Sequence, residues 1–270
     1  MNYKDKDIIY NVSISNDELL EIIINKVENK IPTSIIRKSD GENIIIGYGS
    51  VKGIKLKKYI KKLRHFNISY FNFKFQNFFK KELIKSFYEA DFIGVPIKHN
   101  YYGYSSSVRK FEKNITDYFD FDQNKYVDNH FQLEFLKKEN EDRLVNPLAE
   151  KLISNKKIGL ITYFNLNDFI SAFNSSIVCQ ASIPKRDLRK LNTKMNFEKY
   201  NSVIEFINKN NNKVDIWFLA AGAYAKPFGS QIKKNGGIAV DLGSVIDTWS
   251  GEYHSRKFLR NIINDKNVKN

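Results

Sequence analysis

The segment Asp40-Gly41-Glu42 has two carboxylates two residues apart, at the predicted end of a strand. In an extended segment both would project to the same side, and Gly41 would leave room for a ligand near the backbone. A Mg²⁺ or Mn²⁺ ion bound in this way keeps waters and takes further oxygens from substrate phosphates. The competing interpretation is that Asp-Gly makes a turn and that Glu42 lies in the first turn of a helix.

A second candidate is the junction that follows an apolar strand predicted at 213–220, where Ala221, Gly222 and Ala223 lead into a helix. The N-terminus of such a helix presents backbone N–H groups to a phosphate. Gly222 would permit close approach, and Lys226 would add a positive charge if it points inward. The alternative is a tight strand-helix junction in which small residues only allow packing.

A third candidate is the acid-bearing segment that follows the last predicted strand, 237–242. Asp247 or Glu252 could accept a proton from a hydroxyl group, and Trp249 could stack on a sugar ring. The alternative is an ordinary loop with solvated acids and a core tryptophan. Of the four histidines, which show no metal-ligand spacing, His254 follows this segment closely enough to contact a phosphate or an acceptor.

The elements that must position these residues alternate in the second half of the chain. We predict helices at 15–30, 54–65 and 76–90, strands at 34–39 and 91–97, and largely helical structure over 108–155. After these we predict strand 157–163, helix 167–173, strand 176–183, helix 196–210, strand 213–220, helix 223–235 and strand 237–242. This order predicts an α/β fold, Rossmann-like, with a mostly parallel sheet flanked by helices and with ligands at the carboxyl ends of the strands.

The composition is that of a globular chain, with 42% hydrophobic residues among 270. Without a linker or a repeat, we predict a single domain over 1–270 with a core at about 15–260. The longest apolar runs are far shorter than the ~20 residues that cross a bilayer, and no secretory signal is recognisable. We therefore expect a cytoplasmic protein, with the inner face of the membrane as one place of contact. Cys179, in an apolar run, is predicted to be a core thiol.

Four segments, in order, resemble the bacterial glycosyltransferases of the GT-D fold type. Residues 37–42 resemble that family's Arg-x-Gly-Asp-Gly-Glu strand end with its Asp-x-Glu metal motif, and residues 92–96 look like its Gly-Ile-Pro strand end. Residues 219–225 resemble its Gly-Pro-Thr turn, and 239–243 match its Ala-x-Asp-x-Gly strand. The resemblance spans roughly residues 30–255. It implies a nucleotide-sugar donor, often UDP-linked, an Mn²⁺ or Mg²⁺ ion, and a glycan or lipid-linked acceptor.

Carried over position by position, the resemblance assigns the metal and the diphosphate to Asp40 and Glu42. The acceptor-side acid falls on Asp247, ahead of Glu252. The residues placed around the donor are Arg37, Ser39, Gly41, Gly222 and Lys226. Three departures leave the donor sugar and the base open: Ser39 replaces a glycine, Ala223-Tyr224 replaces Pro-Thr, and Ser244 replaces a histidine.

The charge leaves two further classes of protein open. The 44 Lys and Arg residues exceed the 30 Asp and Glu residues, for a formal charge of +14, which favours anionic partners. Aromatic residues alternate with polar or basic ones at 70–75 and 100–104, which suits single-stranded nucleic acid, sugar stacking or contact with an anionic membrane. The alternatives are thus a nucleic-acid-binding protein and a non-catalytic sugar-nucleotide or polysaccharide-binding module. We expect no specific nucleic-acid partner.

Overall fold

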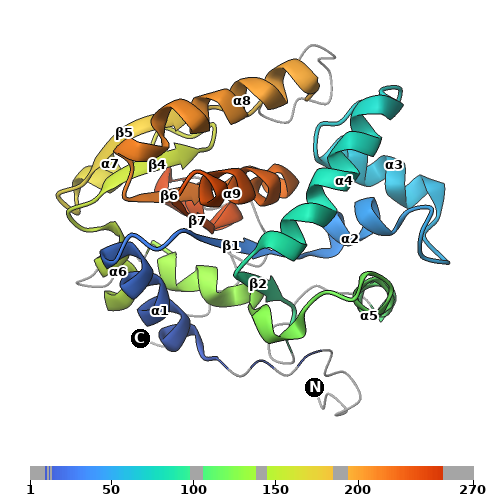
Figure 1. Ribbon diagram of the computed structural model, residues 1–270, viewed down its shortest axis with the longest axis horizontal. Coiled ribbons are helices and arrows are strands. Elements are labelled where there is room, and N and C mark those ends of the chain that lie inside the picture. The colour runs from blue at the N-terminus through green and yellow to red at the C-terminus, as the bar shows by residue number, and fades with distance from the viewer. Residues whose placement is uncertain are drawn as a thin grey trace.

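Seven parallel strands form one sheet in the order β3-β2-β1-β7-β6-β4-β5 (Figure 1). The structure is a computed structural model that describes residues 10, 12, 14–97, 106–137, 145–184 and 194–251. The strands are β1 (Thr33–Arg37), β2 (Phe92–Val95), β3 (Tyr126–Asp128), β4 (Lys157–Ile161), β5 (Ser176–Ala181), β6 (Ile216–Leu219) and β7 (Ile238–Asp241). The predicted α/β fold with a parallel sheet between helices is confirmed.

Helices cover both faces of the sheet because successive strand side chains point to opposite faces. Ile36 packs into a core with α2 (Asp40–Gly47), α3 (Leu56–His65), α4 (Phe73–Glu89), α5 (Ser106–Phe119), α8 (Phe197–Asn210) and α9 (Ala225–Lys234). Ile35 packs into the opposite core, formed with α1 (Asn16–Glu28), α6 (Pro147–Ile153), α7 (Asn167–Ser171) and α10 (Ile246–Trp249). Figure 1 shows α8, α9 and α4 together on one side and α1 with α6 on the other.

Strand β1 lies between β2 and β7, with Arg37 paired to Gly94 and Ile35 paired to Val240. The chain leaves β1 towards β2, on the side away from β7. In open parallel sheets, ligands bind at the carboxyl ends of strands whose connections diverge in this way. The end of β1, where residues 37–42 lie, is therefore on the carboxyl-end side of the sheet, where ligands bind in folds of this kind.

Helix α2 is the main departure from the predicted elements. The sequence predicted a strand that ran into an extended Asp40-Gly41-Glu42 segment, but Asp40 is the first residue of α2 and Ser39 is its N-cap. The prediction that both carboxylates project to the same side of an extended segment is therefore wrong. The apolar run that follows is buried against α3, α4 and α5, and this tertiary packing overrides the strand preference of three isoleucines.

Two further details differ from the predictions. The described part of 108–155 is largely helical, as predicted, but it also contains the unpredicted strand β3 between the 3-10 helices η3 (Gln123–Lys125) and η4 (Asn129–Phe135). β3 has only three residues and, among the described strands, pairs with β2 alone, so its sequence is too short to show the pattern of a strand. Cys179 is half-buried, because β5 is also an edge strand, and burial raises the pKa of its thiol to about 11.

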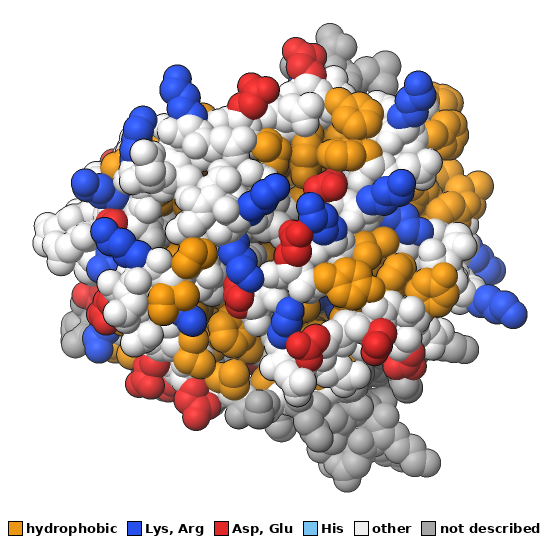
Figure 2. Space-filling model, viewed as in Figure 1, with side chains coloured by type: hydrophobic (Ala, Val, Ile, Leu, Met, Phe, Trp, Pro, Cys, Tyr) orange, Lys and Arg blue, Asp and Glu red, His pale blue; other side chains and the backbone are white. Residues whose placement is uncertain are grey.

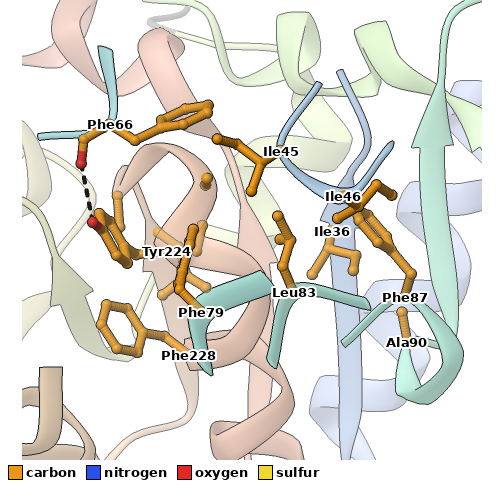
Figure 3. Packing of buried hydrophobic residues seen from close by; sticks show 14 of the residues in the cluster. Ile36, Ile45, Ile46, Phe66, Phe79, Leu83, Phe87, Ala90, Tyr224 and Phe228 are labelled. Carbon is orange, nitrogen blue, oxygen red and sulfur yellow. Dashed lines mark hydrogen bonds between the residues drawn. The ribbon is translucent and has the colours of Figure 1, made fainter. Parts of the chain in front are cut away.

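The connection between α3 and α4 is tied to the start of α9. Figure 3 shows Phe66 above the core formed by Phe79, Tyr224 and Phe228, and the Tyr224 hydroxyl donates a hydrogen bond to the Phe66 carbonyl at 3.0 Å. This places the α3–α4 connection beside the ends of β1 and β6. Among the helices of the described chain, none is both long enough and apolar enough to cross a bilayer.

Candidate active site

Four charged side chains of alternating sign form a row at the carboxyl ends of β1, β6 and β7. The Lys226 ammonium lies 2.8 Å from Glu42 Oε1 and 2.9 Å from Asp241 Oδ2. Arg37 continues the row, with its Nη2 atom 3.7 Å from Asp241 Oδ1. Glu42, Lys226 and Asp241 are all buried, and Arg37 is half-buried. The row is buried but electrically balanced, with two cations and two carboxylates.

Each member of the row comes from a different element. Arg37 is the last residue of β1, and Asp241 is the last residue of β7. Lys226 lies in the first turn of α9, after the 3-10 helix η7 (Gly222–Tyr224) that follows β6. Glu42 lies in the first turn of α2. Because parallel strands bring their carboxyl ends to one edge, residues about 200 positions apart in sequence meet here.

The row fixes the ionisation of its members. Burial opposes the charge on Glu42, but the Lys226 ammonium and the hydroxyl of Ser39, which donates to Glu42 Oε2, overcome it, so the pKa of Glu42 falls to about 2. Burial likewise opposes the charge on Lys226, but Asp241 and Glu42 together raise its pKa above the ordinary value. Glu42 is thus a carboxylate, and Lys226 a cation, at neutral pH.

The Arg37 end of the row has polar atoms without hydrogen-bond partners. Arg37 Nε and both carboxylate oxygens of Asp241 are buried and make no hydrogen bond within the described part of the chain. The ammonium of Lys226 is close to Asp241 Oδ2, so that contact is an ion pair without hydrogen-bond alignment. Buried polar atoms without partners are rare and expensive, which makes this end the natural place for a bound group.

Glycines let Arg37 lie deep between neighbouring elements. A Cβ on Gly243, which has φ +52°, would lie 1.7 Å from Arg37 Nη2, so the guanidinium rests directly on the backbone after β7. A Cβ on Gly94 would lie 3.2 Å from Arg37 Cγ and 3.4 Å from Asn129 Oδ1. The buried Asn129 Oδ1 also has no hydrogen-bond partner among the described residues. Arg37 therefore occupies a slot between the ends of β7 and β2.

The predicted donor-binding residues gather here, with one difference in their surroundings. Lys226 points inward, which is the condition under which it would add a charge here, and it also donates to the Gly222 carbonyl at 3.1 Å. Gly222, with φ +57°, and Gly41 both face Phe66, whose ring atoms would lie 3.5 Å and 2.5 Å from a Cβ at those two positions. The space beside Gly41 is thus filled by the Phe66 ring, whereas Gly222 is exposed.

Of the two predicted metal ligands, the structure describes the side chain of Glu42 but not that of Asp40. Glu42 lies in the row, and the backbone of Asp40 begins α2, but the Asp40 side chain lies outside the described part. Within the described residues, no group of three or more His, Cys, Asp or Glu side chains is placed to hold a metal ion. The competing interpretation, in which Glu42 lies in the first turn of a helix, describes its backbone correctly.

The acid-bearing segment after β7 folds as the 3-10 helix η8 (Gly243–Val245) and α10. Asp247 is half-buried in the first turn of α10. Trp249 is not a sugar platform, because it is buried, stacks on Phe169 at 4.5 Å and donates to the Phe135 carbonyl at 2.7 Å. Glu252 and His254 lie outside the described residues.

Two parts of the site were not identified as such from sequence. Asp241 was recognised only as part of a strand motif, although it contacts both cations of the row. His130 is half-buried, and its pKa is lowered by burial and by the charge of Arg37 against the opposing charge of Asp128. For Asp241, the available signal was its position as the last residue of a buried strand.

Comparison with known proteins adds a family assignment. Residues 14–249 match the GT-D fold-like domain family. A solved structure described as a highly conserved domain of unknown function with a distinct glycosyltransferase fold is 16% identical, with a TM-score of 0.47, and the match covers 87% of this chain and 78% of that one. Another, described as a new glycosyltransferase from Streptococcus sanguinis, is 12% identical, with a TM-score of 0.47 and coverage of 87% and 81%. No curated protein sequence matches this chain.

Proposed function

Because the chain belongs to the GT-D-like family, with a match over residues 14–249, we propose that it is a glycosyltransferase. Its donor is a nucleoside-diphosphate sugar, UDP-linked, and its acceptor is a glycan, glycolipid or glycoprotein in surface polysaccharide or glycoconjugate synthesis. The observation that carries the proposal is the buried row Arg37-Asp241-Lys226-Glu42 at the carboxyl ends of the central strands. This is where a chain with this fold positions a ligand.

We assign a Mn²⁺ or Mg²⁺ ion to Asp40 and Glu42, with the diphosphate supplying further oxygens. The carboxylate oxygens of these residues are suitable ligands for such an ion. Glu42 is ionised, and although Lys226 and Ser39 each contact one of its oxygens, a carboxylate offers about four lone-pair sites, so it can also bind an ion. When bound, such an ion supplies neutralisation of the charge that builds on the departing diphosphate.

The residues of the chain do the rest of the work. Lys226 keeps Glu42 ionised and in place, and Asp241 holds Lys226 and Arg37 at the strand ends. The Arg37 guanidinium is half-buried, and its Nε atom has no hydrogen-bond partner among the described residues, so we assign it to donate to a phosphate or sugar oxygen. The exposed backbone of Gly222 at the turn before α9 offers an anion contact next to Lys226. These contacts favour departure of the diphosphate.

The proton of the acceptor hydroxyl goes to a carboxylate on the α10 side. We assign this role to Asp247 first, in the first turn of α10, and to Glu252 second. A general base needs only to come within hydrogen-bond reach of the acceptor in the bound complex. If the anomeric centre inverts, this residue takes the proton as the new bond forms.

The test is release of nucleoside diphosphate from a panel of UDP-sugars by the full chain. We expect turnover that requires Mn²⁺ or Mg²⁺, that stops in excess chelator, and that falls at least 100-fold in Asp40→Ala and in Glu42→Ala. Full turnover in chelator or in either variant would overturn the metal assignment. Absence of turnover and of nucleotide binding in the wild type would overturn the proposed function itself.

The base is tested separately with Asp247→Asn and Glu252→Gln. The variant that removes the base loses the rise of kcat with pH, while its affinity for the nucleotide, measured by calorimetry, is unchanged. Wild-type pH profiles in both variants would dismiss the pair.

A further inference from the structure

The positive charge of the protein is concentrated in one stretch of the chain. Residues 43–81 contain ten Lys and Arg residues and no Asp or Glu, so this stretch carries ten of the fourteen net positive charges. It forms α3, most of α2 and the first half of α4. The charge of the protein is thus a local feature and not an even surface excess.

Helix α3 displays this charge on one face. Tyr59 and Leu63 are buried, whereas Lys57, Lys61 and Arg64 are exposed. Their spacing of four and then three residues puts these three cations on the same outward face of the helix. Helix α3 itself contains no Asp or Glu.

An aromatic corner adjoins the basic face of α3. Tyr70, Phe71 and Phe73 are 38%, 71% and 67% exposed, and the guanidinium of Arg64 lies over the Tyr70 ring at 5.6 Å. Figure 2 shows hydrophobic and Lys or Arg side chains together along the right-hand edge of this view, where α3 and the start of α4 lie in Figure 1. An exposed group of large apolar rings is unfavourable in water and marks an interaction surface.

The aromatic corner is joined to the candidate active site by a short connection. Phe66, which lies against Gly41 and Gly222, is only a few residues from Tyr70. Ile68 pairs with Met195 as an isolated parallel bridge, and a groove of about 640 Å³ opens beside it, lined by Phe71, Lys194 and Lys199 among others. A partner held at the corner would therefore lie next to the site.

We propose that the basic-aromatic face, made of Lys57, Lys61, Arg64, Tyr70, Phe71 and Phe73, docks the protein on an anionic membrane. Aromatic rings partition to the level of the lipid headgroups, and lysines and arginines are attracted to anionic lipids, so the two together give stable peripheral binding. Leu56 at the start of α3 is also exposed, and an aliphatic side chain favours lipid over base stacking. That the membrane presents a lipid-linked acceptor rests on the proposed function.

The test is co-sedimentation of the full chain with vesicles of phosphatidylcholine, with and without 30% phosphatidylglycerol, at about 0.15 M salt. We expect binding to the anionic vesicles only. Lys57→Gln, Lys61→Gln and Arg64→Gln combined reduce the partition coefficient at least tenfold, since each basic residue near the surface is worth roughly fivefold. Phe71→Ser with Phe73→Ser reduces binding also at high salt, where the electrostatic part is screened.

Two control variants match these changes. Lys209→Gln and Lys234→Gln near the C-terminal ends of α8 and α9, with Lys213→Gln in the 3-10 helix η6 (Asn211–Lys213), remove the same charge from exposed positions, and Tyr118→Ser removes an exposed ring from α5. Both controls should bind vesicles within about threefold of the wild type, because none of these positions belongs to the basic-aromatic face.

Three results would overturn the proposal. These are no preference for anionic vesicles, an equal loss in the charge control, or binding of an oligonucleotide that competes with vesicles and survives Phe71→Ser with Phe73→Ser, which would identify a nucleic-acid surface. UDP-sugar turnover without vesicles is measured in parallel. Vesicle binding without turnover and without nucleotide binding would refute the proposed function alone, and turnover without vesicle binding would refute the docking surface alone.

Discussion

Glu112 and Asp241 are buried carboxylates reached by two consecutive residues at the end of β1, yet their surroundings differ. Lys38 contacts Glu112, and Arg37 contacts Asp241. The two oxygens of Glu112 accept hydrogen bonds from Lys38, Tyr10 and Asn43, whereas the oxygens of Asp241 accept none from the described residues.

The difference separates a carboxylate that is paired within the protein from one that has room for the ligand of the proposed function. The Glu112 cluster joins the end of β1 to α2 and α5 and leaves its carboxylate fully hydrogen-bonded. Such a cluster fixes the geometry of neighbouring elements, and its carboxylate is already paired. Among the described residues, the Asp241 end keeps unmet hydrogen-bonding capacity next to Arg37, which a bound group or water can satisfy. The Glu112 cluster therefore holds α2 in place, and this position of α2 brings Glu42 into the row with Lys226 and Asp241.

The largest expected effect comes from unbalancing the Glu112 cluster. Glu112→Gln leaves the buried Lys38 ammonium without a counter-charge, so the free energy of unfolding should fall by about 3–5 kcal/mol in urea titrations. Lys38→Met combined with Glu112→Leu should recover most of this loss, because no charge is then left buried alone. A loss below about 1 kcal/mol in Glu112→Gln would contradict the structural role of the pair.

Asp241→Asn should reverse the pattern, with a smaller loss of stability and a larger loss of activity. Lys226 keeps Glu42 as its counter-ion, so the free energy of unfolding should fall by only about 1–2 kcal/mol. Donor turnover should fall about 100-fold, because Arg37 and Lys226 lose the carboxylate that positions them.

Calorimetry with UDP distinguishes positioning from mere destabilisation in Asp241→Asn. A weaker affinity for UDP in a fully folded variant supports the positioning role. Unchanged turnover, or a loss of stability as large as that of Glu112→Gln, would remove the contrast between the two clusters.

Acid should weaken the Glu42 end of the row. Burial disfavours the charge on Glu42, but Lys226 and Ser39 outweigh it, so the pKa in the folded protein is about 2, below the 4.5 of an exposed glutamate. The unfolded chain then binds the extra proton, and stability is complete above about pH 4.5 and is lost as the pH falls towards 2. One such proton gives a slope of at most about 1.4 kcal/mol per pH unit.

Urea unfolding of the wild type and Glu42→Gln at several pH values between 2.5 and 6 measures this slope. In the variant, the slope of the unfolding free energy against pH should be smaller by the amount that one proton contributes. Parallel stability curves for the two proteins would show that Glu42 is not held as an ion by Lys226.

The sequence predicted the second half of the fold well because its elements are marked locally. Strands β4 to β7 are short apolar runs bounded by polar turns, and the helices between them keep helical spacing. Helix α2 carries no such mark, since its three consecutive isoleucines equally suit a strand. Only burial against α3, α4 and α5, which is tertiary information, decides for a helix.

The candidate site divides in the same way. Glu42 and Lys226 could be selected because each follows a glycine, Gly41 or Gly222, by no more than four residues, shortly after a predicted strand. Their contact, and the part of Asp241 in it, depends on β7 lying between β1 and β6. No local pattern encodes that order of strands, because β7 is inserted beside β1 from about 200 residues farther along the chain.

The smallest expected effect concerns Ser39, which directly follows Arg37 and Lys38 in sequence. Its side chain contacts Glu42 in the row. Its hydroxyl donates to Glu42 Oε2, whereas Lys226 supplies both a charge and a hydrogen bond, so Lys226 dominates the shift in the pKa of Glu42. Ser39→Ala should therefore cost about 1 kcal/mol of stability and reduce donor turnover only a few-fold. A loss as large as that of Asp241→Asn would mean that the hydroxyl contacts the donor directly. In that case, Ser39→Thr, which keeps the hydroxyl, should restore most of the turnover.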